Sequence, residues 1–397
     1  MTIRKNATVR EKKMKTRRDF LKRTAKSGIA GIIASGIAPA YSKNMSLKKT
    51  DVSLEQAREV HNRLLILDGH NDMPVERVQR GENPLNWKQR DLTYHTDIPR
   101  MKEGNYDCGF FIVGNGPKAN VWVTTELILE QIDAYPEDLM LILSSKDVVR
   151  AHETGKIGVI LSIEGIGAWL NGNIDTLRLF YRLGLRLAGI SHGEGGSEPN
   201  FLQGTASIYR ACTPEERVED RKNAGGLSHL GLEVLRVSNE LGIVTDLSHI
   251  NDKAFYDVLE HSSLPPIMSH TAVFSLCNHS RCMMDDQIKA LASTGGVMGI
   301  AFAPQFIHPD SKQATIDRVV EHICYVRDLV GIDYVGIGND FDGLGDITPV
   351  VPEVSQLVHL TRSMLAYGLS GEEIQKVWGG NFLRILRQTI DRPSKTG

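Results

Sequence analysis

The sequence predicts a (β/α)8 barrel that forms a single domain, with loop insertions at the carboxyl ends of its strands. Eight short apolar runs rich in β-branched residues recur along the 397-residue chain, at 64–68, 108–113, 158–163, 185–190, 243–247, 266–268, 297–303 and 334–337. Strands that are apolar on both faces and alternate with helices indicate a parallel sheet covered by helices. Eight such units suit a barrel whose typical size is ~250 residues before insertions.

Helical periodicity separates most of these runs. It predicts helices over 227–241, 252–259, 285–291 and 316–330, and a final helix over 371–388 that Ser370 caps. The segment 197–225 is expected to be a hairpin-like insertion at the mouth of the barrel. The main alternative is a doubly wound open sheet, in which a glycine-rich phosphate loop usually follows the first strand. Here the first run continues into DGHNDMP (68–74), which is no such loop and favours the barrel.

The first 40 residues resemble a twin-arginine export signal. Arg17-Arg18 is followed by Phe20-Leu21, then by an apolar stretch at 28–38 and by the small residues Ala38-Pro39-Ala40 of a cleavage site. The apolar stretch is too short and too rich in glycine for a stable membrane anchor. We therefore expect a periplasmic or otherwise exported protein, with an extension at 41–53, the barrel at 54–390 and a tail at 391–397. The alternative is an amphipathic or disordered N-terminus of a cytoplasmic protein.

The composition argues against a nucleic-acid partner and against a cysteine-based framework. The formal net charge of −2 provides no basic excess for nucleic acid. The five cysteines are odd in number and scattered, so they predict neither a disulfide framework nor a zinc ribbon. A single disulfide between two of them stays possible. They are Cys108, Cys212, Cys277, Cys282 and Cys324.

Ionisable side chains gather where the predicted strands end. Six of the eight runs finish in a histidine or a carboxylate, at His70 with Asp72, Glu164, His192, His249, His270, and Asp340 with Asp342. In a (β/α)8 barrel the active site is assembled from the carboxyl ends of several strands. The sequence therefore predicts one site at the mouth of the barrel.

Five of these residues suit a site for a borderline divalent ion such as Zn²⁺ by their type and placement. His70 and Asp72 stand at positions i and i+2, which point to the same side of a strand; taken alone, Asp72 could instead cap a turn. Glu164 ends a very apolar run, where a carboxylate is costly to bury unless it binds a metal or pairs with a cation such as Arg186. His249 and His270 each follow a serine at the end of neighbouring strands.

Three further residues suit roles toward a substrate. His192 could polarise a carbonyl or hold an oxyanion, or it could cap a loop. Arg281 could grip a substrate carboxylate, or it could form an exposed ion pair. Asp340 is well placed to take a proton from an activated water, a role that Asp342 could share.

The motifs resemble those of the membrane (renal) dipeptidases, a family of zinc metallopeptidases with amidohydrolase-like barrels. The resemblance runs from about 54 to 386 and rests on DGHNDMP, SIEG (162–165), GISH (189–192), IVTDLSH (243–249), PPIMSH (265–270), RCMMDD (281–286) and GIGNDFDG (336–343). It implies two zinc ions, one on His70 and Asp72 and one on His249 and His270, with Glu164 bridging them. It further implies that His192 and Arg281 bind the substrate and that Asp340 handles the proton of the bridging water.

The resulting hypothesis is a zinc-dependent dipeptidase in which a metal-bridging hydroxide attacks the peptide bond and a D-residue is tolerated at the C-terminal side. The resemblance leaves a homodimer open. A related binuclear amidase or lactonase is the enzymatic alternative, and a metal-holding binding protein without catalysis is the alternative from another class.

Overall fold

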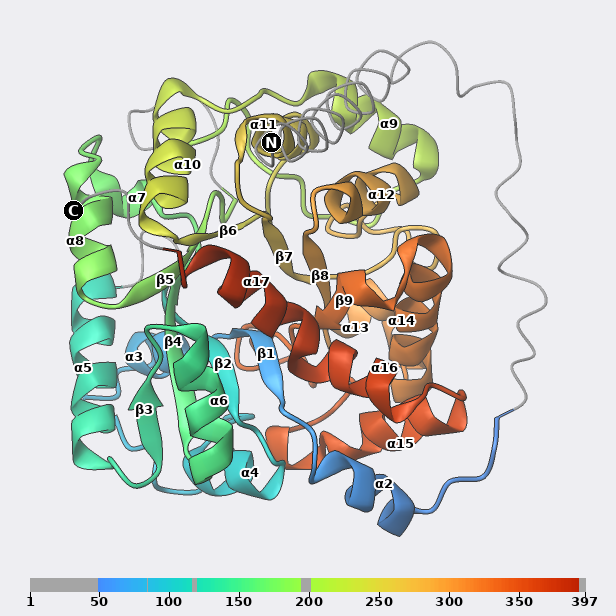
Figure 1. Ribbon diagram of the computed structural model, residues 1–397. Helices are drawn as coiled ribbons and strands as arrows, with labels where there is room; N and C mark the ends of the chain where they lie inside the picture. The colour runs from blue at the N-terminus through green and yellow to red at the C-terminus, as the bar shows by residue number, and fades with distance from the viewer. Residues whose placement is uncertain (1–48, 84, 116–119, 194–200, 393–397) are drawn as a thin grey trace, which may run out of the picture.

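The strands form the predicted barrel in the computed structural model, which describes residues 49–83, 85–115, 120–193 and 201–392 (Figure 1). Eight parallel strands pair in the order β1 (Leu67–Asn71), β2 (Cys108–Gly114), β4 (Ile157–Ile163), β5 (Leu185–Gly189), β6 (Val244–Asp246), β7 (Ile267–Thr271), β8 (Val297–Ile300) and β9 (Val335–Ile337). The chain after β9 returns to β1, where the Asp72 amide donates to the Phe341 carbonyl at 2.9 Å. The barrel is therefore nearly closed, as the sequence predicts.

A ninth strand, β3 (Leu139–Leu141), was not expected. It pairs in parallel with β4 alone and lies off the barrel. It has three residues, of which only Leu139 is fully buried. So short and half-exposed a segment has neither the length nor the continuous apolar character by which the other strands are recognised.

Helices cover the outside of the barrel, including those predicted over 227–241, 252–259, 285–291 and 316–330. They are α2 (Leu54–His61), α3 (Met73–Gln79), α4 (Ile98–Glu103), α5 (Val121–Ala134), α6 (Ser145–Thr154), α7 (Gly167–Leu170), α8 (Asp175–Arg182), α9 (Pro214–Asn223), α10 (His229–Leu241), α11 (Asp252–His261), α12 (Asp285–Ser293), α13 (Pro304–Ile307), α14 (Ile316–Val330), α15 (Val358–Ala366), α16 (Gly371–Gln375) and α17 (Asn381–Thr389). Short helical turns are η1 (Ser311–Gln313), η2 (Ile332–Tyr334), η3 (Val354–Gln356) and η4 (Lys376–Gly380).

Two predicted segments differ in detail. The C-terminal helix expected over 371–388 is divided into α16 and α17 by the π-helical turn η4. Its start is as expected, because Ser370 caps α16 by accepting from the Glu373 amide. The described part of the insertion at 197–225 is not a hairpin: it contains α9, which Thr213 caps and which begins at Pro214.

The C-terminal helix α17 closes the end of the barrel opposite the strand carboxyl ends. In Figure 1 it lies across the strands near the centre of the view. Phe382 and Leu386 of α17 pack with side chains from the barrel strands, namely Leu67, Phe110, Ile160, Leu187, Val244, Ile267 and Val297. This packing fills the amino end of the barrel, and the strand-end residues lie at the opposite end.

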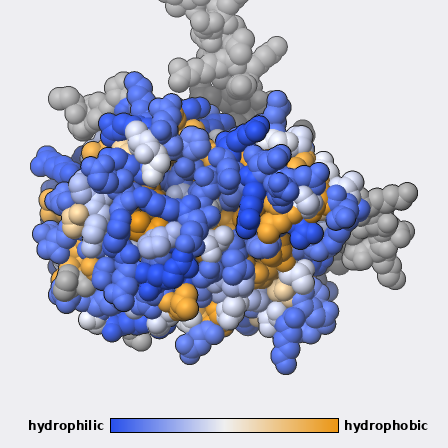
Figure 2. All heavy atoms as spheres, turned by 90° about the horizontal axis from the view of Figure 1, so that it is seen from below, coloured by the Kyte–Doolittle hydropathy of each residue, from blue (hydrophilic) through white to orange (hydrophobic). Residues whose placement is uncertain are grey.

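The predicted export signal, at 1–40, lies outside the described residues. Among the residues that are described, no helix has both the length and the apolar character needed to cross a membrane. Figure 2 shows a face on which hydrophilic side chains predominate and hydrophobic ones form smaller patches. All five cysteines are buried, and none is in a disulfide.

Candidate active site

The strand-end residues surround one pocket of about 290 Å³. The residues lining it include Asp72, Glu164, His192, His249, His270, Arg281 and Asp340. His70 is 1% exposed and lies directly beneath, in contact with Asp72. The fold therefore brings together all eight residues that the sequence singled out.

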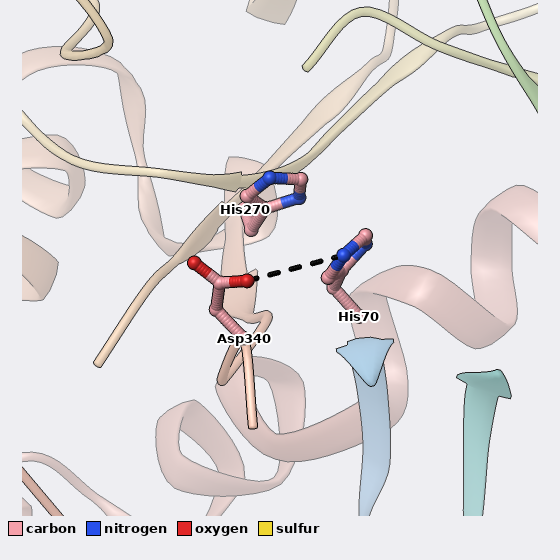
Figure 3. Close-up of side chains that lie close together, drawn as sticks. All are labelled: His70, His270 and Asp340. Atoms are coloured by element: carbon pink, nitrogen blue, oxygen red, sulfur yellow. Dashed lines mark ion pairs between the residues drawn. The ribbon is translucent and has the colours of Figure 1, made fainter. Parts of the chain in front are cut away.

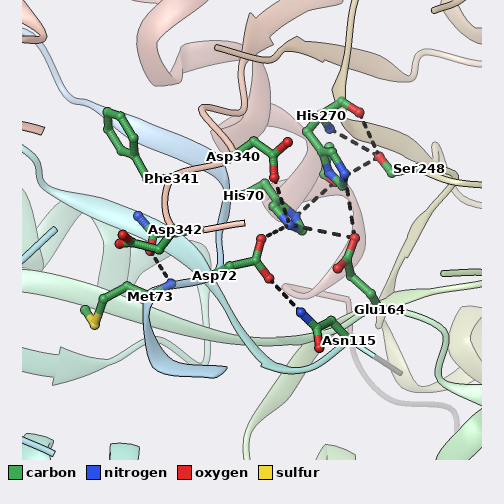
Figure 4. A network of polar contacts seen from close by, with 12 residues as sticks. His70, Asp72, Met73, Asn115, Glu164, Ser248, His270, Asp340, Phe341 and Asp342 are labelled. Carbon is green, nitrogen blue, oxygen red and sulfur yellow. Dashed lines mark hydrogen bonds and ion pairs between the residues drawn. The ribbon is translucent and has the colours of Figure 1, made fainter. Parts of the chain in front are cut away.

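The carboxylate of Glu164 faces several histidines of this cluster, His70 among them (Figure 4). Its Oε1 atom lies 3.3 Å from Nε2 of His249 and 3.7 Å from Nε2 of both His70 and His270. This oxygen is buried and has no hydrogen-bond partner among the described residues. Three imidazole nitrogens that converge on one unpartnered carboxylate oxygen are the arrangement expected of metal ligands, because a buried charge needs a counter-charge.

Three groups of ligand atoms lie within 4.8 Å of one another: His70, Asp72 and Glu164; Glu164, His249 and His270; and His70, His270 and Asp340. The first two groups share Glu164. In Figure 3 the Asp340 carboxylate of the third group points toward His70, at 4.0 Å from its Nε2 atom. The donor set of imidazoles and carboxylates fits divalent ions such as Zn²⁺.

His70 and Asp72 meet, although not by simple strand alternation. Strand β1 ends at Asn71, and Asp72 stands at the first position before α3 with φ −90° and ψ 0°. Its carboxylate makes no capping hydrogen bond and instead lies 3.0 Å from His70 Nε2. This geometry argues against the alternative that Asp72 caps a turn.

Left-handed backbone turns aim several of the side chains. Five non-glycine residues in the described part of the chain have positive φ, and His249, Asp340 and Asp342 are three of them, with φ of 63°, 63° and 68°. Such conformations cost free energy for residues with a Cβ atom and cluster at functional sites. Here they turn the chain sharply just after β6 and β9.

Mutual electrostatics perturb the buried groups strongly. Burial opposes protonation of His70, but Glu164 and Asp72 outweigh it and raise the pKa of His70 to about 10. Burial, with the nearby cation of Arg281, lowers the pKa of His249 to about 3. Burial raises the pKa of Asp340 to about 8, and the Asp72 and Glu164 carboxylates add to that effect. Metal binding requires neutral imidazoles, so a bound cation would replace the His70 proton as counter-charge.

Asp340 and Asp342 have different surroundings. The Asp342 carboxylate accepts from the His95 amide at 2.7 Å and from Thr96 Oγ1 at 2.8 Å. Asp342 is therefore hydrogen-bonded to the loop before α4, and of the two aspartates only Asp340 faces the metal-ligand cluster. Gly343 makes this packing feasible, since a Cβ atom there would lie 2.3 Å from Asp72 Oδ2 and 2.7 Å from Asp340 Oδ1.

Arg281 and His192 complete the pocket. Arg281 is 6% exposed, so it is not the surface ion pair that was the alternative, and its Nε atom has no partner among the described residues. His192 is one-third exposed, and its Nε2 lies 3.7 Å from Glu164 Oε2. Arg186, the alternative partner of Glu164, instead donates to carbonyls of Leu143, Tyr181 and Leu185.

Some lining residues were not anticipated from the sequence. Asn115, after β2, donates to Asp72 Oδ1 at 3.4 Å. Ile208, Tyr209, Phe306 and Leu344 form the apolar part of the pocket wall. Phe306 lies in the four-residue helix α13 and the others lie on loops, and in such segments hydrophobic periodicity carries little information. For Asn115, the only available signal was its position just after a strand.

The chain is similar to known proteins over most of its length. The family model described as membrane dipeptidase, peptidase family M19, matches residues 54–396. The chain belongs to this family. An uncharacterized dipeptidase of Schizosaccharomyces pombe is 30% identical over 86% of this chain and 84% of its own length. Dipeptidase tcpJ of Claviceps purpurea is 27% identical over 82% of this chain and 77% of its own.

A solved structure extends the likeness to three dimensions. A metallo peptidase from Rhodobacter sphaeroides, liganded with a phosphinate mimic of the dipeptide L-Ala-D-Ala, has a TM-score of 0.72 and 26% identity, covering 82% of this chain and 99% of that one. Membership of family M19 makes this chain a metallo-dipeptidase, a hydrolase acting on peptide bonds. The predicted enzyme class and its dependence on a metal are thereby confirmed.

Proposed function

We propose that the chain is a binuclear zinc dipeptidase whose two ions share Glu164. The observation that carries this proposal is the convergence of three imidazole nitrogens on the unpartnered Oε1 atom of Glu164. His70 and Asp72 would hold one ion, and His249 and His270 the other. When bound, two such ions supply a water of lowered pKa and a Lewis acid for the peptide carbonyl.

The remaining side chains bind and orient the dipeptide. We assign the C-terminal carboxylate of the substrate to Arg281, because this guanidinium is buried and a carboxylate can pair with it in a bidentate manner. His192 lies at the rim of the cluster, where its ring can donate to the carbonyl oxygen as negative charge develops on it.

Asp340 moves the proton. Its carboxylate lines the pocket opposite Glu164 and is 4.0 Å from His70 Nε2. A carboxylate held there can accept a proton from the attacking water and donate it to the leaving amine. Asp342 is unsuitable for this role because two donors already occupy its oxygens.

The substrate class we propose is dipeptides, with a D-residue accepted at the C-terminal side. The structural neighbour from Rhodobacter sphaeroides holds a mimic of L-Ala-D-Ala, which supports this choice. The test is a panel of L,L- and L,D-dipeptides, N-acyl amino acids and lactones, assayed with zinc analysis of the same sample. Cleavage of dipeptides with two zinc ions per chain is expected. Cleavage of lactones or N-acyl amino acids alone would contradict the dipeptidase assignment.

We also propose that the protein is exported through its twin-arginine signal and cleaved after Ala40. The expected result is a periplasmic protein that begins at Tyr41, measured by intact mass. Arg17→Lys with Arg18→Lys should hold the uncleaved chain in the cytoplasm, whereas the same exchange at Arg4 and Arg10 should not. A wild-type protein that stays uncleaved in the cytoplasm would contradict the proposal.

A further inference from the structure

A buried hydrogen-bond network lies behind the candidate metal ligands. Asp246 ends β6 and Ser269 lies in β7, and the two side chains are 1% and 0% exposed. Asp246 Oδ1 accepts from the backbone amides of Ser248 at 3.0 Å and Ser269 at 2.8 Å. Its other oxygen, Oδ2, lies 2.6 Å from Ser269 Oγ, a distance typical of a hydroxyl that donates to a carboxylate.

The direction of this bond fixes what Ser269 can do on its other side. A hydroxyl has one proton to donate, and here that proton is given to Asp246. Ser269 Oγ can therefore only accept from its remaining neighbours. Its two nearest other neighbours are His270 Nδ1, at 2.9 Å, and Ser248 Oγ, at 3.0 Å, and His70 Nδ1 lies at the longer distance of 3.5 Å.

An acceptor beside Nδ1 determines the tautomer of the imidazole. His270 must carry its proton on Nδ1, which leaves the lone pair on Nε2. That Nε2 atom faces Glu164 Oε1 at 3.7 Å and His249 Nε2 at 3.0 Å. A proton on Nε2 would point directly into this group and would block a metal ion.

We propose that Asp246 and Ser269 are a positioning pair that fixes the tautomer of His270 and so sets the metal affinity of the position formed with His249. The proposal rests on the proposed metal ligands and goes beyond them by assigning a role to two residues outside the pocket. The same hydroxyl has a weaker hold on His70, because the distance there is longer. The two metal positions should therefore respond unequally.

Asp246→Asn is the sharpest variant. The side-chain oxygen of asparagine must occupy the place of Oδ1, where two backbone amides donate, so its amide nitrogen faces Ser269 Oγ. The serine then accepts from the amide, and its own proton is free to turn to His270 Nδ1 at 2.9 Å or to Ser248 Oγ at 3.0 Å. A proton turned to His270 reverses the polarity of the network and favours the wrong tautomer.

Zinc affinity is measured by equilibrating the purified holoenzyme with a series of chelator-buffered zinc concentrations and counting zinc per chain. Asp246→Asn should lower the zinc affinity of the position formed by His249 and His270 by roughly 10- to 100-fold, which is the usual effect of losing a hydrogen-bond partner of a metal-bound histidine. Ser269→Ala should lower this zinc affinity less, because alanine places no hydrogen-bond donor next to His270 Nδ1. Ser269→Thr keeps the hydroxyl and should restore wild-type affinity.

Matched controls come from the opposite end of the barrel. Asp107 is buried just before β2, where it accepts from the Ile66 amide at 2.7 Å, and Ser262 is buried before β7. Asp107→Asn and Ser262→Ala should lower stability without changing zinc affinity.

The outcomes separate this proposal from the function on which it rests. Failure of the wild-type chain to bind two zinc ions would overturn the proposed metal site itself. A wild type that binds two ions, with unchanged affinity in Asp246→Asn, would overturn only the positioning role. If Asp246→Asn does not fold, the comparison of Ser269→Ala with Ser269→Thr decides, and equal affinity in those two variants would overturn the proposal.

Discussion

Arg281 is a buried cation to which we have assigned the substrate carboxylate. Burial is the main influence on this guanidinium and lowers its pKa against the opposing effect of the Asp340 and Glu164 carboxylates, and Arg281 forms no ion pair with any described residue. A substrate carboxylate would supply the missing counter-charge. The residue therefore suits recognition of a free C-terminus more than it suits stabilisation of the fold.

We expect Arg281→Gln to lower kcat/KM for a dipeptide by roughly 10- to 100-fold, because a hydrogen bond to a charged group contributes about 1.5–3 kcal/mol. The C-terminal amide of the same dipeptide should be affected much less. Arg210→Gln is the control, since Arg210 pairs with Asp220 on the insertion. Equal losses for the acid and the amide would show that Arg281 does not bind the carboxylate.

Gly343 lies so close to the Asp72 and Asp340 carboxylates that no side chain fits there. Gly343→Ala would bring a Cβ atom to 2.3 Å from Asp72 Oδ2, which must then move away from His70. We expect a loss of bound metal and of kcat, measured by metal analysis and steady-state kinetics. Gly371→Ala, where a Cβ atom meets nothing within 4 Å, is the matched control. Full metal content in Gly343→Ala would refute this expectation.

At the scale of elements, α14 joins parts of the molecule that local sequence does not connect. Its His322 is fully buried; Nδ1 accepts from the Val273 amide and Nε2 donates to the Ile307 carbonyl, each at 3.0 Å. The helix thereby holds both the loop after β7 and α13. Burial lowers the pKa of His322 to about 3.

Acid should therefore destabilise α14 and its contacts. The unfolded chain binds a proton at His322 below pH ~6.5, whereas the folded chain does so only near pH 3, so stability falls as the pH drops between these values. At pH 5 the protonation of His322 in the unfolded chain lowers the free energy of unfolding by about 2 kcal/mol. His322→Gln keeps a donor and an acceptor without titrating.

Chemical denaturation of both proteins at pH 7.5 and pH 5 measures this cost. His322→Gln should lose less free energy of unfolding between the two pH values than the wild type does. His229→Gln, at an exposed position, should behave as the wild type. Identical pH dependence in all three proteins would exclude His322 as the titrating group.

At the scale of the whole molecule, the proposed metal ligands tie together strands that are distant along the chain. They come from the ends of β1, β4, β6 and β7, and α17 closes the opposite end of the barrel. Ions that bind this group only in the folded state stabilise the barrel as a unit.

Metal removal should accordingly lower the melting temperature. Free metal at 100 times its Kd stabilises a folded chain by about 2.7 kcal/mol per site. Thermal unfolding before and after chelation, then after zinc is restored, measures this shift. In Glu164→Gln the shift should be much smaller, because the shared ligand has lost its charge. A chelator that leaves the wild-type melting temperature unchanged would contradict the metal site.

The sequence by itself determined the barrel and the composition of the site. Periodicity sufficed for α14, whose bounds were predicted to the residue, because its apolar face and its Thr315 cap are local features. It failed for β3 and for the π-helical turn η4, which depend on packing by distant segments. The residues that meet at the pocket could be picked out from the sequence because carboxyl ends of parallel strands meet at one end of a barrel.

Only the tertiary structure decided how these residues are arranged around the pocket. In the structure Asp340 points toward the metal-ligand cluster and Asp342 points toward Thr96. The backbone direction after β9 causes this difference, and the sequence cannot show it because both residues are aspartates. The tertiary structure placed Arg186 away from Glu164 and put Asn115 and Tyr209 at the pocket. It also joined Asp246 to His270 through Ser269, because hydrogen-bond polarity across strands depends on distances that no linear pattern contains.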